Sequence, residues 1–410
     1  MEHFNESIKT LQKWLKIKSV KSEAVAAAPF GEGVKNMLLT ALKDAEALGF
    51  KTVNYDNYVG EVIFGDGEDI DGLAVLCHLD VVPEGDENLW SHKPYGADID
   101  DGKLYSRGVE DDKGPAAVCL YALKKLKDEG FKPNRKIKLI FGCDEESGWG
   151  CIDHYKKVAV MPDEGFSPDG DFPVIYSEKG IYHIKYAFPL SPIVKSVVGG
   201  DRVNVVPDKA AVEYENGRIV RFSGKTAHGS TPELGDNAVK KAVLNMVQNG
   251  AFNKEDYLNL FENAKLFEDL VDESGALTFS PNVATSKNGF IYFDVDVRYP
   301  SKTDFSVIES RLKSIGNYTV SEHKKPLFVD KNSKLVTTLN AIYNKLSGRN
   351  ESPVTTGGGT YARALKNGVA FGPLPEDAGG RAHMPDEFMT IDELKLCFDV
   401  YYRAIKELCE

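Results

Sequence analysis

The sequence lacks the features of a secreted or membrane protein. Its six cysteines are scattered along 410 residues with no pair at C-x-x-C spacing, which argues against a disulfide framework and suits a reducing compartment. No apolar run approaches the roughly 18 residues that a membrane-spanning helix needs. The first residues (MEHFNE) have neither the basic nor the apolar region of a signal peptide. We therefore expect a cytoplasmic protein with no membrane partner.

The sequence also lacks an excess of basic residues. The 62 acidic side chains outnumber the 50 of Lys and Arg, which gives a formal net charge of −12. Binding to a nucleic-acid backbone calls for a basic patch or stripe, so we expect no nucleic-acid partner. An acidic protein can still take an anionic small substrate if its cleft is locally basic, so the charge leaves the substrate class open.

Strands and helices alternate in the first part of the chain. Apolar runs predict strands at residues 73–77 and 136–141, with a helix at 115–126 between them. The length allows two domains, and there are no internal repeats. The alternation predicts an α/β domain with a mostly parallel central sheet flanked by helices.

The character of the chain changes after residue 178. Short strands, including one expected at 203–206, come close together there and are followed by helices, which is an α+β pattern. The α/β character then returns, with a helix expected at 361–366. We therefore predict a catalytic domain formed by residues 1–178 and 327–410, interrupted by an inserted α+β domain at 179–326.

A histidine and an aspartate follow the first predicted strand directly. In an open α/β sheet, ligands gather beyond the carboxyl ends of the strands. His78 can ligate a metal ion at such an end, and Asp80 is placed to hold the far imidazole nitrogen and fix its tautomer. Alone the pair is weak evidence, because a His-x-Asp sequence at a strand end is more often a polar loop.

Three acidic segments and a second histidine extend this candidate site. Asp111 lies in an acidic stretch that opens a helix, where the ordinary explanation is a favourable interaction with the helix dipole. Glu145 and Glu146 follow the next strand, and buried carboxylates are costly unless cations or water accompany them. Asp169 lies in the sequence SPDG, and His383 lies in RAHMPD after the inserted domain.

Together these side chains predict a carboxylate-rich site for two divalent metal ions. One carboxylate can bridge the ions and leave each with a histidine and a terminal carboxylate. Two ions about 3.5–4 Å apart polarise a carbonyl group and hold a water molecule between them. Glu145 is the spare carboxylate, and we interpret it as the general base that takes the proton of that water.

The motifs resemble those of the M20 family of metallopeptidases. The matching segments are residues 77–83 (CHLDVVP), 107–114 (RGVEDDKG), 144–146 (DEE), 167–169 (SPD) and 381–383 (RAH). Residues 204–210 (NVVPDKA) and 357–363 (GGGTYAR) are similar to the PepV-like branch, the bacterial Xaa-His or carnosine-type dipeptidases. The resemblance covers nearly the whole chain. It implies a zinc-peptidase catalytic domain, a ferredoxin-like lid domain, and hydrolysis of dipeptides or very short peptides.

The resemblance also implies a role for each residue of the metal site. The ligands that it implies are Asp111 as the bridge, His78 with Asp169 on one ion, and Glu146 with His383 on the other. Asp80 would orient His78, and Glu145 would be the base. Zinc is the metal expected for the family, although histidine with carboxylate ligands suits manganese and cobalt as well.

In the inserted lid, the resemblance assigns residues to the substrate. His228 would steady the oxyanion of the tetrahedral intermediate with help from Asn204, and Arg298 would clamp the terminal carboxylate. From the residues alone, a surface salt bridge at a strand end is the better interpretation of Arg298. Backbone N–H groups of Gly358 and Gly359 would bind the same carboxylate, although a glycine turn between a strand and a helix explains them equally well.

One departure from the family pattern concerns the length of the lid. This segment is shorter than in PepV-like dipeptidases, which enclose the substrate within one chain. A shorter lid fits either a monomer or a homodimer in which His228 serves the neighbouring subunit. Two alternative functions stay open: an amidase or deacylase that acts on N-acyl amino acids, and a non-catalytic homologue, which would have no use for Glu145.

Overall fold

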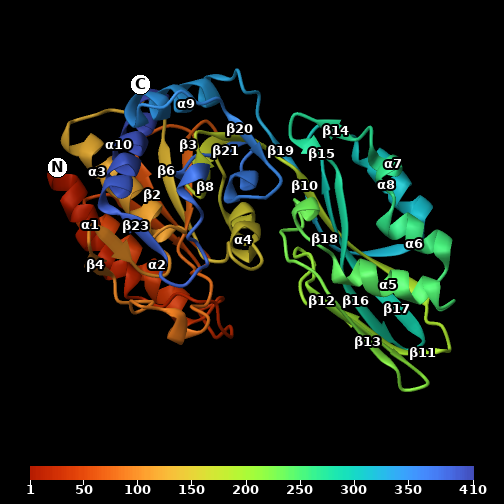
Figure 1. Cartoon of the computed structure of the whole chain (residues 1–410). Coiled ribbons are helices and arrows are strands. Elements are labelled where there is room, and N and C mark those ends of the chain that lie inside the picture. The colour runs from red at the N-terminus through yellow and green to blue at the C-terminus, as the bar shows by residue number, and fades with distance from the viewer. The chain divides into compact units, whose positions relative to one another are not determined.

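The chain forms two compact units in the computed structural model, which describes all 410 residues (Figure 1). The second unit is inserted between segments of the first. The first unit comprises Met1–Tyr176, Val329–Val354 and Thr360–Glu410, and the second comprises Ser177–Phe328 and Thr355–Gly359. The short segment Thr355–Gly359 packs with the second unit, although the sequence placed it in the catalytic domain.

A mostly parallel sheet forms the centre of the first unit. Six of its nine strands are, in spatial order, β1 (Lys51–Tyr55), β2 (Val59–Phe64), β6 (Ile137–Gly142), β3 (Leu73–His78), β7 (Glu164–Ser167) and β21 (Asn367–Ala370). The last four run parallel to one another, whereas β1 and β2 form an antiparallel edge. β3 and β6 are buried along their whole length, as is typical of strands covered on both faces.

Helices cover both faces of this sheet. They are α1 (Glu2–Leu15), α2 (Glu32–Ala47), α3 (Lys113–Asp128), α4 (Gly150–Val158), α9 (Lys334–Ser347) and α10 (Ile391–Leu408). Alternate residues of a strand point to opposite faces. On β6, the ring of Phe141 meets Trp14 of α1, whereas Lys138 contacts the hydroxyl of Tyr155 on α4. α1 and α4 therefore lie on opposite faces, and the predicted α/β fold class is confirmed.

The second unit is an antiparallel sheet with helices. In spatial order its strands are β13 (Ile219–Ser223), β12 (Lys209–Tyr214), β11 (Val194–Gly199), β16 (Thr278–Lys287), β17 (Phe290–Tyr299), β10 (Gly180–Pro189) and β18 (Tyr318–Lys324). The longer helices are α5 (Ala238–Gln248), α6 (Lys254–Phe261) and α8 (Phe305–Ile315). Apolar residues of both layers form one core that is separate from the core of the first unit. This is the α+β arrangement that the sequence predicted.

Shorter elements complete the fold. In chain order they are β4 (Asp98–Asp100), β5 (Lys103–Tyr105), β8 (Gly170–Phe172), β9 (Ile175–Glu178), α7 (Ala264–Phe267), β14 (Val271–Asp272), β15 (Gly275–Ala276), β19 (Leu327–Phe328), β20 (Val354–Thr356), β22 (Pro373–Pro375) and β23 (Phe388–Thr390). Of these, β9, β19 and β20 extend the central sheet, and most of the others form small sheets of two or three strands. Four 3-10 turns complete the set, η1 (Glu87–Leu89), η2 (Pro232–Leu234), η3 (Tyr361–Ala364) and η4 (Glu376–Ala378). No helix is both long enough and apolar enough to cross a lipid bilayer.

Two of the predicted elements are wrong. The helix expected at 361–366 is only the single 3-10 turn η3, which leads at once into the parallel strand β21. The strand expected at 203–206 is reduced to one isolated bridge, between Val205 and His228. In both places a short apolar run serves as a connection, and its length alone did not distinguish a turn from a regular element.

Candidate metal centre

The carboxyl ends of three parallel strands carry most of the predicted ligands. β3 ends at His78, which is paired in register with Gly142, the last residue of β6. Residues 144–146 follow β6, and Asp169 follows the end of β7 at Ser167. Because parallel strands end at the same edge of a sheet, these side chains meet there although they are far apart in the sequence.

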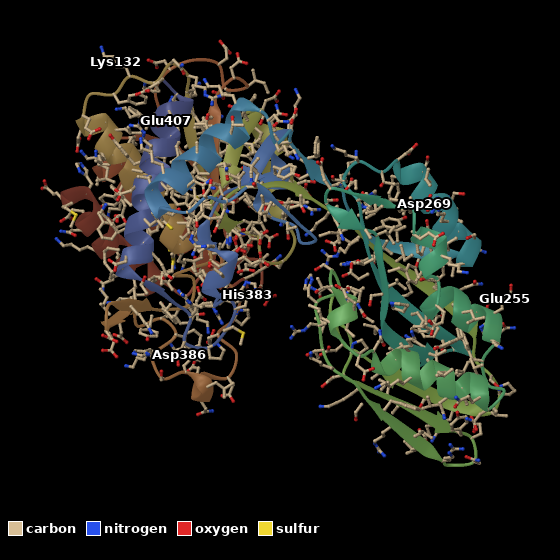
Figure 2. The ribbon with its side chains drawn as sticks, turned by 45° about the horizontal axis from the view of Figure 1, so that its top comes forward. Lys132, Glu255, Asp269, His383, Asp386 and Glu407 are labelled. Atoms are coloured by element: carbon tan, nitrogen blue, oxygen red, sulfur yellow. The ribbon has the colours of Figure 1, made fainter.

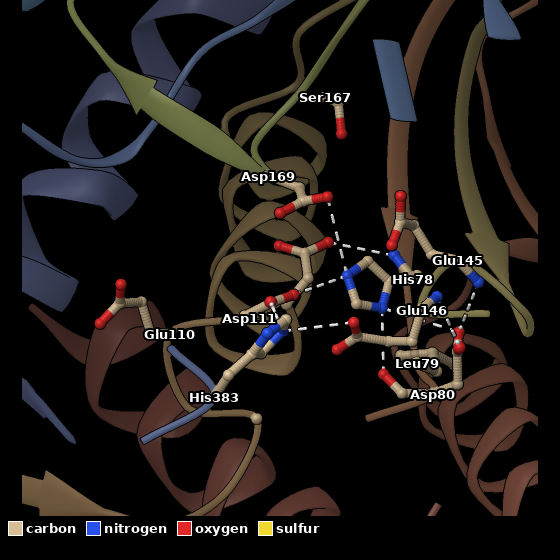
Figure 3. Close-up of polar contacts among 12 residues, drawn as sticks. His78, Leu79, Asp80, Glu110, Asp111, Glu145, Glu146, Ser167, Asp169 and His383 are labelled. Carbon is tan, nitrogen blue, oxygen red and sulfur yellow. Dashed lines mark hydrogen bonds and ion pairs between the residues drawn. The ribbon is translucent and has the colours of Figure 1, made fainter. Parts of the chain in front are cut away.

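Asp111 and His383 reach the same edge from loops. Asp111 lies just before α3, which begins at Lys113, and His383 lies in the loop before β23. Asp111 Oδ1 is 2.7 Å from Nε2 of His78, and its Oδ2 is 2.9 Å from Nε2 of His383 (Figure 3). Asp111 therefore stands between the two imidazole rings with one oxygen toward each.

Glu146 and Asp169 complete this cluster. Glu146 Oε2 is 3.2 Å from Nε2 of His383, and Asp169 Oδ2 is 3.8 Å from Nε2 of His78. The side chain of His78 is fully buried, whereas that of His383 is 51% exposed, so His383 lies on the solvent side. The structure thus brings all five predicted ligands together, with Asp111 at the centre.

Asp80 contacts His78 through its backbone as well as its carboxylate. His78 Nδ1 lies 3.0 Å from the backbone carbonyl oxygen of Asp80, whereas the nearer carboxylate oxygen is 3.6 Å away. The carboxylate also accepts the backbone N–H groups of Glu145 and Glu146, each at 3.1 Å. The reason is that the loop after β6 presents two successive N–H groups that need acceptors. The carbonyl group orients the ring, and the carboxylate holds the backbone of the glutamate pair.

The donor atoms of the cluster fit divalent cations. Three buried atoms have no hydrogen-bond partner, namely His78 Nε2, Asp111 Oδ1 and Glu146 Oε1. Nδ1 of His78 faces a carbonyl oxygen, which can only accept, so a neutral ring would carry its lone pair on Nε2, 2.7 Å from an oxygen of Asp111. Such a contact is unfavourable unless a cation lies between the atoms. Histidine with carboxylate is a ligand set that zinc, manganese and cobalt accept.

Burial and crowding of like charges shift the pKa values in the cluster. Burial raises the pKa of Glu145 well above its usual range, and the carboxylate of Asp169 adds to the rise. Burial, with Asp111 as the neighbouring charge, raises the pKa of Asp169 to about 7. Hydrogen bonds to Asp111 and Glu146 raise the pKa of His383 to about 11. Bound cations would relieve the repulsion among these carboxylates.

Trp149 is a contact of the predicted base that the sequence analysis missed. Its indole Nε1 donates a hydrogen bond to Glu145 Oε1 at 3.1 Å. Its ring also meets Tyr361 edge-on, with 5.3 Å between the ring centroids. The two residues of the hydrogen bond are four positions apart, but the segment between them is a turn and not a helix. The one available signal was an aromatic N–H donor in the glycine-flanked sequence GWG shortly after the glutamate pair.

The predicted substrate residues of the lid gather within the second unit. The backbone N–H of Gly229 donates to the carbonyl oxygen of Asn204 at 2.7 Å, which places the segment of His228 beside that of Asn204. Arg298 lies near the end of β17, and its Nη1 donates to the carbonyl oxygen of Gly357 at 3.3 Å. The glycine segment and the guanidinium group are therefore neighbours.

Arg298 is held in a buried ion pair, so the interpretation as a surface salt bridge is wrong. Its Nε donates to Asp296 Oδ1 at 2.7 Å and its Nη2 donates to Oδ2 at 3.1 Å, and both side chains are buried. This two-point contact fixes the plane of the guanidinium group. Glycine at position 229 allows the close approach, because a Cβ atom there would lie 2.1 Å from Asp296 Oδ2.

His228 and Gly358 each contact a side chain only two residues away. His228 Nδ1 lies 2.7 Å from the hydroxyl of Ser230. Burial lowers the pKa of His228, and the charge of Arg298 lowers it further. The N–H of Gly358 donates to Thr356 Oγ1 at 3.1 Å inside the turn that also contains Gly359.

Fold and site together fit a metal-dependent enzyme of the α/β class, with the predicted ligands at the carboxyl edge of parallel strands. Comparison with protein families makes this specific. The model of peptidase family M20/M25/M40 matches residues 74–407, and the chain belongs to this family.

Curated relatives match the chain over nearly its whole length. YtjP of Bacillus subtilis, a protein named as a dipeptidase, is 35% identical over 453 residues, which cover 98% of this chain and 97% of the relative. The Beta-Ala-Xaa dipeptidase of Lactobacillus delbrueckii subsp. lactis is 31% identical over 454 residues, covering 98% and 95%. Both alignments are longer than the 410 residues of this chain, so the relatives carry residues that it lacks.

Solved structures share the fold at low sequence identity. Human carnosine dipeptidase 1 matches with a TM-score of 0.63 and 16% identity, over 99% of this chain and 97% of that chain. Aminoacylhistidine dipeptidase from Vibrio alginolyticus matches with a TM-score of 0.61 and 16% identity, over 98% and 96%. These likenesses establish the fold.

Proposed function

We propose that the protein is a dipeptidase that hydrolyses dipeptides or very short peptides with two divalent metal ions. The observation that carries the proposal is the convergence of potential ligand atoms of His78, Asp111 and Glu146 within 4.8 Å of one another at the sheet edge. The family membership supports peptide hydrolysis, and the names of the relatives support dipeptides. Zinc is the first metal to test, followed by manganese and cobalt.

The contact geometry supports one division of the ligands between the ions. Because each oxygen of Asp111 faces a different histidine, we assign it as the bridge. His78 with Asp169 would hold one ion, and Glu146 with His383 would hold the other, as their contacts suggest. When bound, the ions would polarise the peptide carbonyl group and acidify water.

Glu145 is the proposed general base. Its Oε1 accepts the indole N–H of Trp149, and its backbone N–H donates to Asp80, so the residue is held through both its side chain and its backbone. Oε2 is then the oxygen that we assign to take a proton from the attacking water. The same carboxyl group, once protonated, would act as a general acid and pass that proton to the leaving amine as the C–N bond breaks.

The second unit is proposed to bind the substrate. His228 would stabilise the oxyanion together with Asn204, and Arg298 would bind the terminal carboxylate of the peptide. The fixed guanidinium plane and its contact with the glycine segment support this assignment. A contribution from the N–H groups of Gly358 and Gly359 is part of the same proposal, although the N–H of Gly358 already has an acceptor within its turn.

The test is a panel of free and N-acetylated dipeptides, assayed with chelated enzyme after addition of Zn²⁺, Mn²⁺ or Co²⁺. Metal-restored cleavage of the free dipeptides is the expected result, and it ranks the metals. Cleavage of the acetylated compounds alone would reassign the protein as an amidase or deacylase. No cleavage with any metal would contradict enzymatic function. A cytoplasmic location, and a monomer or homodimer as the assembly, complete the proposal and are open to fractionation and light scattering.

A further inference from the structure

Two loops that carry metal-site residues leave the same small sheet. β5 and β23 form an antiparallel pair, with Tyr105 opposite Phe388. Beyond this pair, the backbone N–H of Ser106 donates to the carbonyl oxygen of Glu387 at 3.0 Å. One strand continues into residues 107–112, which we name the Asp111 loop. The other is preceded by residues 379–387, which we name the His383 loop.

Beyond this hydrogen bond the two backbones separate, and the side-chain carboxylate of Glu387 accepts the backbone N–H groups instead. Its Oε1 accepts the N–H of Gly108 at 2.9 Å and that of Glu110 at 3.0 Å. Its Oε2 accepts Nη1 of Arg107 at 2.5 Å. Glu387 is 1% exposed, so these contacts are shielded from water. A side chain of the His383 loop thus holds the backbone of the Asp111 loop.

Glu110 makes the reverse contact. Its Oε1 accepts the backbone N–H of Arg381 at 3.4 Å, whereas its Oε2 is buried without a hydrogen-bond partner. The guanidinium group of Arg381 is in turn fixed by the two oxygens of Glu393, at 2.9 and 3.0 Å. A side chain of the Asp111 loop therefore holds the backbone of the His383 loop, next to His383 itself.

The His383 loop needs such support because its backbone is strained. His383 and Asp386 both have positive φ, 65° and 56°, a conformation that costs free energy for residues other than glycine. Figure 2 shows both residues on this loop. Asp386 is anchored separately, since its Oδ1 accepts the N–H groups of Ser91 at 2.8 Å and of His92 at 3.1 Å. No comparable anchor holds the side of the loop before His383 except the contacts of Glu110 and Arg381.

We propose that Glu110 and Glu387 form a reciprocal clasp that sets the distance between Asp111 and His383 before metal binds. They are positioning residues, because neither touches the predicted ligand atoms. The inference rests on the proposed function in one respect, that Asp111 and His383 share an ion. A loop that is already ordered loses little entropy when the ion binds, so the clasp raises the affinity for that ion.

The test uses the full-length protein and three variants. Glu110→Ala removes the acceptor, and Glu110→Gln keeps an acceptor oxygen of the same size. The matched control is Glu164→Ala, which removes an ion pair with Arg135 (2.7 Å) at the opposite ends of the parallel strands. Glu387 is left intact, because its loss would strand the buried guanidinium group of Arg107 and endanger folding.

The first measurement is hydrogen–deuterium exchange of residues 379–387 in chelated protein, and it needs no metal. We expect exchange about fivefold faster in Glu110→Ala, as the loss of one hydrogen bond implies, and wild-type rates in Glu110→Gln and Glu164→Ala. Unchanged exchange in Glu110→Ala would overturn the clasp, whatever the protein does with metals.

The second measurement is calorimetric titration of Zn²⁺ into the same chelated proteins. We expect Glu110→Ala to bind one of two ions about 10–100-fold more weakly, with recovery in Glu110→Gln and no change in Glu164→Ala. Equal affinities in Glu110→Ala and wild type would overturn the role in metal binding. Wild-type protein that binds fewer than two ions would instead overturn the proposed function, and exchange would still decide whether the clasp exists.

Discussion

The two groups of predicted functional residues differ in how completely their charges are matched. In the first unit, the carboxylates of Asp111, Glu146 and Asp169 crowd around two histidines. In the second unit, the guanidinium group of Arg298 is matched to Asp296. The first group holds more carboxylates than its histidines can balance, whereas the second is charge-matched as the chain folds it. The difference predicts that metal controls the first group and leaves the second unaffected.

Replacing the base should separate chemistry from metal binding most clearly. Glu145→Gln keeps the shape and the acceptor for Trp149 but removes the proton-accepting charge. We expect kcat to fall by about 10²–10⁴-fold, the usual value of general base catalysis. Metal content, measured by plasma emission spectrometry, should stay at the wild-type value. Loss of metal together with activity would make Glu145 a ligand instead of the base.

A substitution in the second unit should reduce activity without touching the metal. For His228→Ala we expect a fall in kcat of about 10²–10³-fold, as for the loss of one oxyanion donor. The stabilisation of the variant by Zn²⁺ should match that of wild type, because His228 belongs to the group that needs no cation. The assignment fails if steady-state kinetics show wild-type kcat.

The guanidinium group of Arg298, held by its two-point contact with Asp296, should increase the affinity for the substrate. Arg298→Lys keeps the charge but cannot make the two-point contact with Asp296. We expect KM for a dipeptide to rise by about 10–100-fold, since a charge-assisted hydrogen bond contributes about 1.5–3 kcal/mol. Dipeptide amides, which lack the terminal carboxylate, are the control and should show the same KM with both enzymes. A rise in KM for both substrates alike would point to disruption of the fold.

Removing the metal should lower the free energy of unfolding of the first unit, by an amount that depends on the metal concentration. A ligand that binds only the folded state at 100 times its dissociation constant adds about 2.7 kcal/mol to the free energy of unfolding. We therefore expect chelation to lower the midpoint of thermal unfolding, followed by calorimetry, and Zn²⁺ to restore it. Because the two units have separate cores, we expect the second unit to unfold in its own thermal transition, which the chelator leaves unchanged. An unfolding curve that is indifferent to chelator would contradict the comparison.

The sequence predicted the parts of the molecule that depend on local pattern. Apolar runs located β3 and β6, and the rule that ligands gather at the carboxyl ends of parallel strands brought His78 and Glu146 together. The family and the fold class are confirmed, and the roles assigned to the site residues stay predictions.

Other features depend on contacts between distant segments, which no local pattern encodes. The carboxylate of Asp80 binds backbone groups that lie 65 and 66 positions away. Glu387 and Glu110 act across 277 positions. The segment Thr355–Gly359 joins the second unit through contacts with distant residues, such as the hydrogen bond from Arg298 to the carbonyl oxygen of Gly357. In each case the two partners are far apart in the sequence and meet only in the folded chain.

Because the predicted ligands are far apart in the sequence, they leave the ribosome at different stages of synthesis. His78, Asp111, Glu146 and Asp169 all precede the inserted unit, whereas His383 belongs to the last tenth of the chain. The final strand of the parallel sheet, β21, also comes after the insertion. Domains generally fold as units during synthesis, N-terminal ones first, yet here the first unit must wait for the last residues. A nascent or truncated chain that stops before His383 therefore holds four of the five predicted ligands without the fifth.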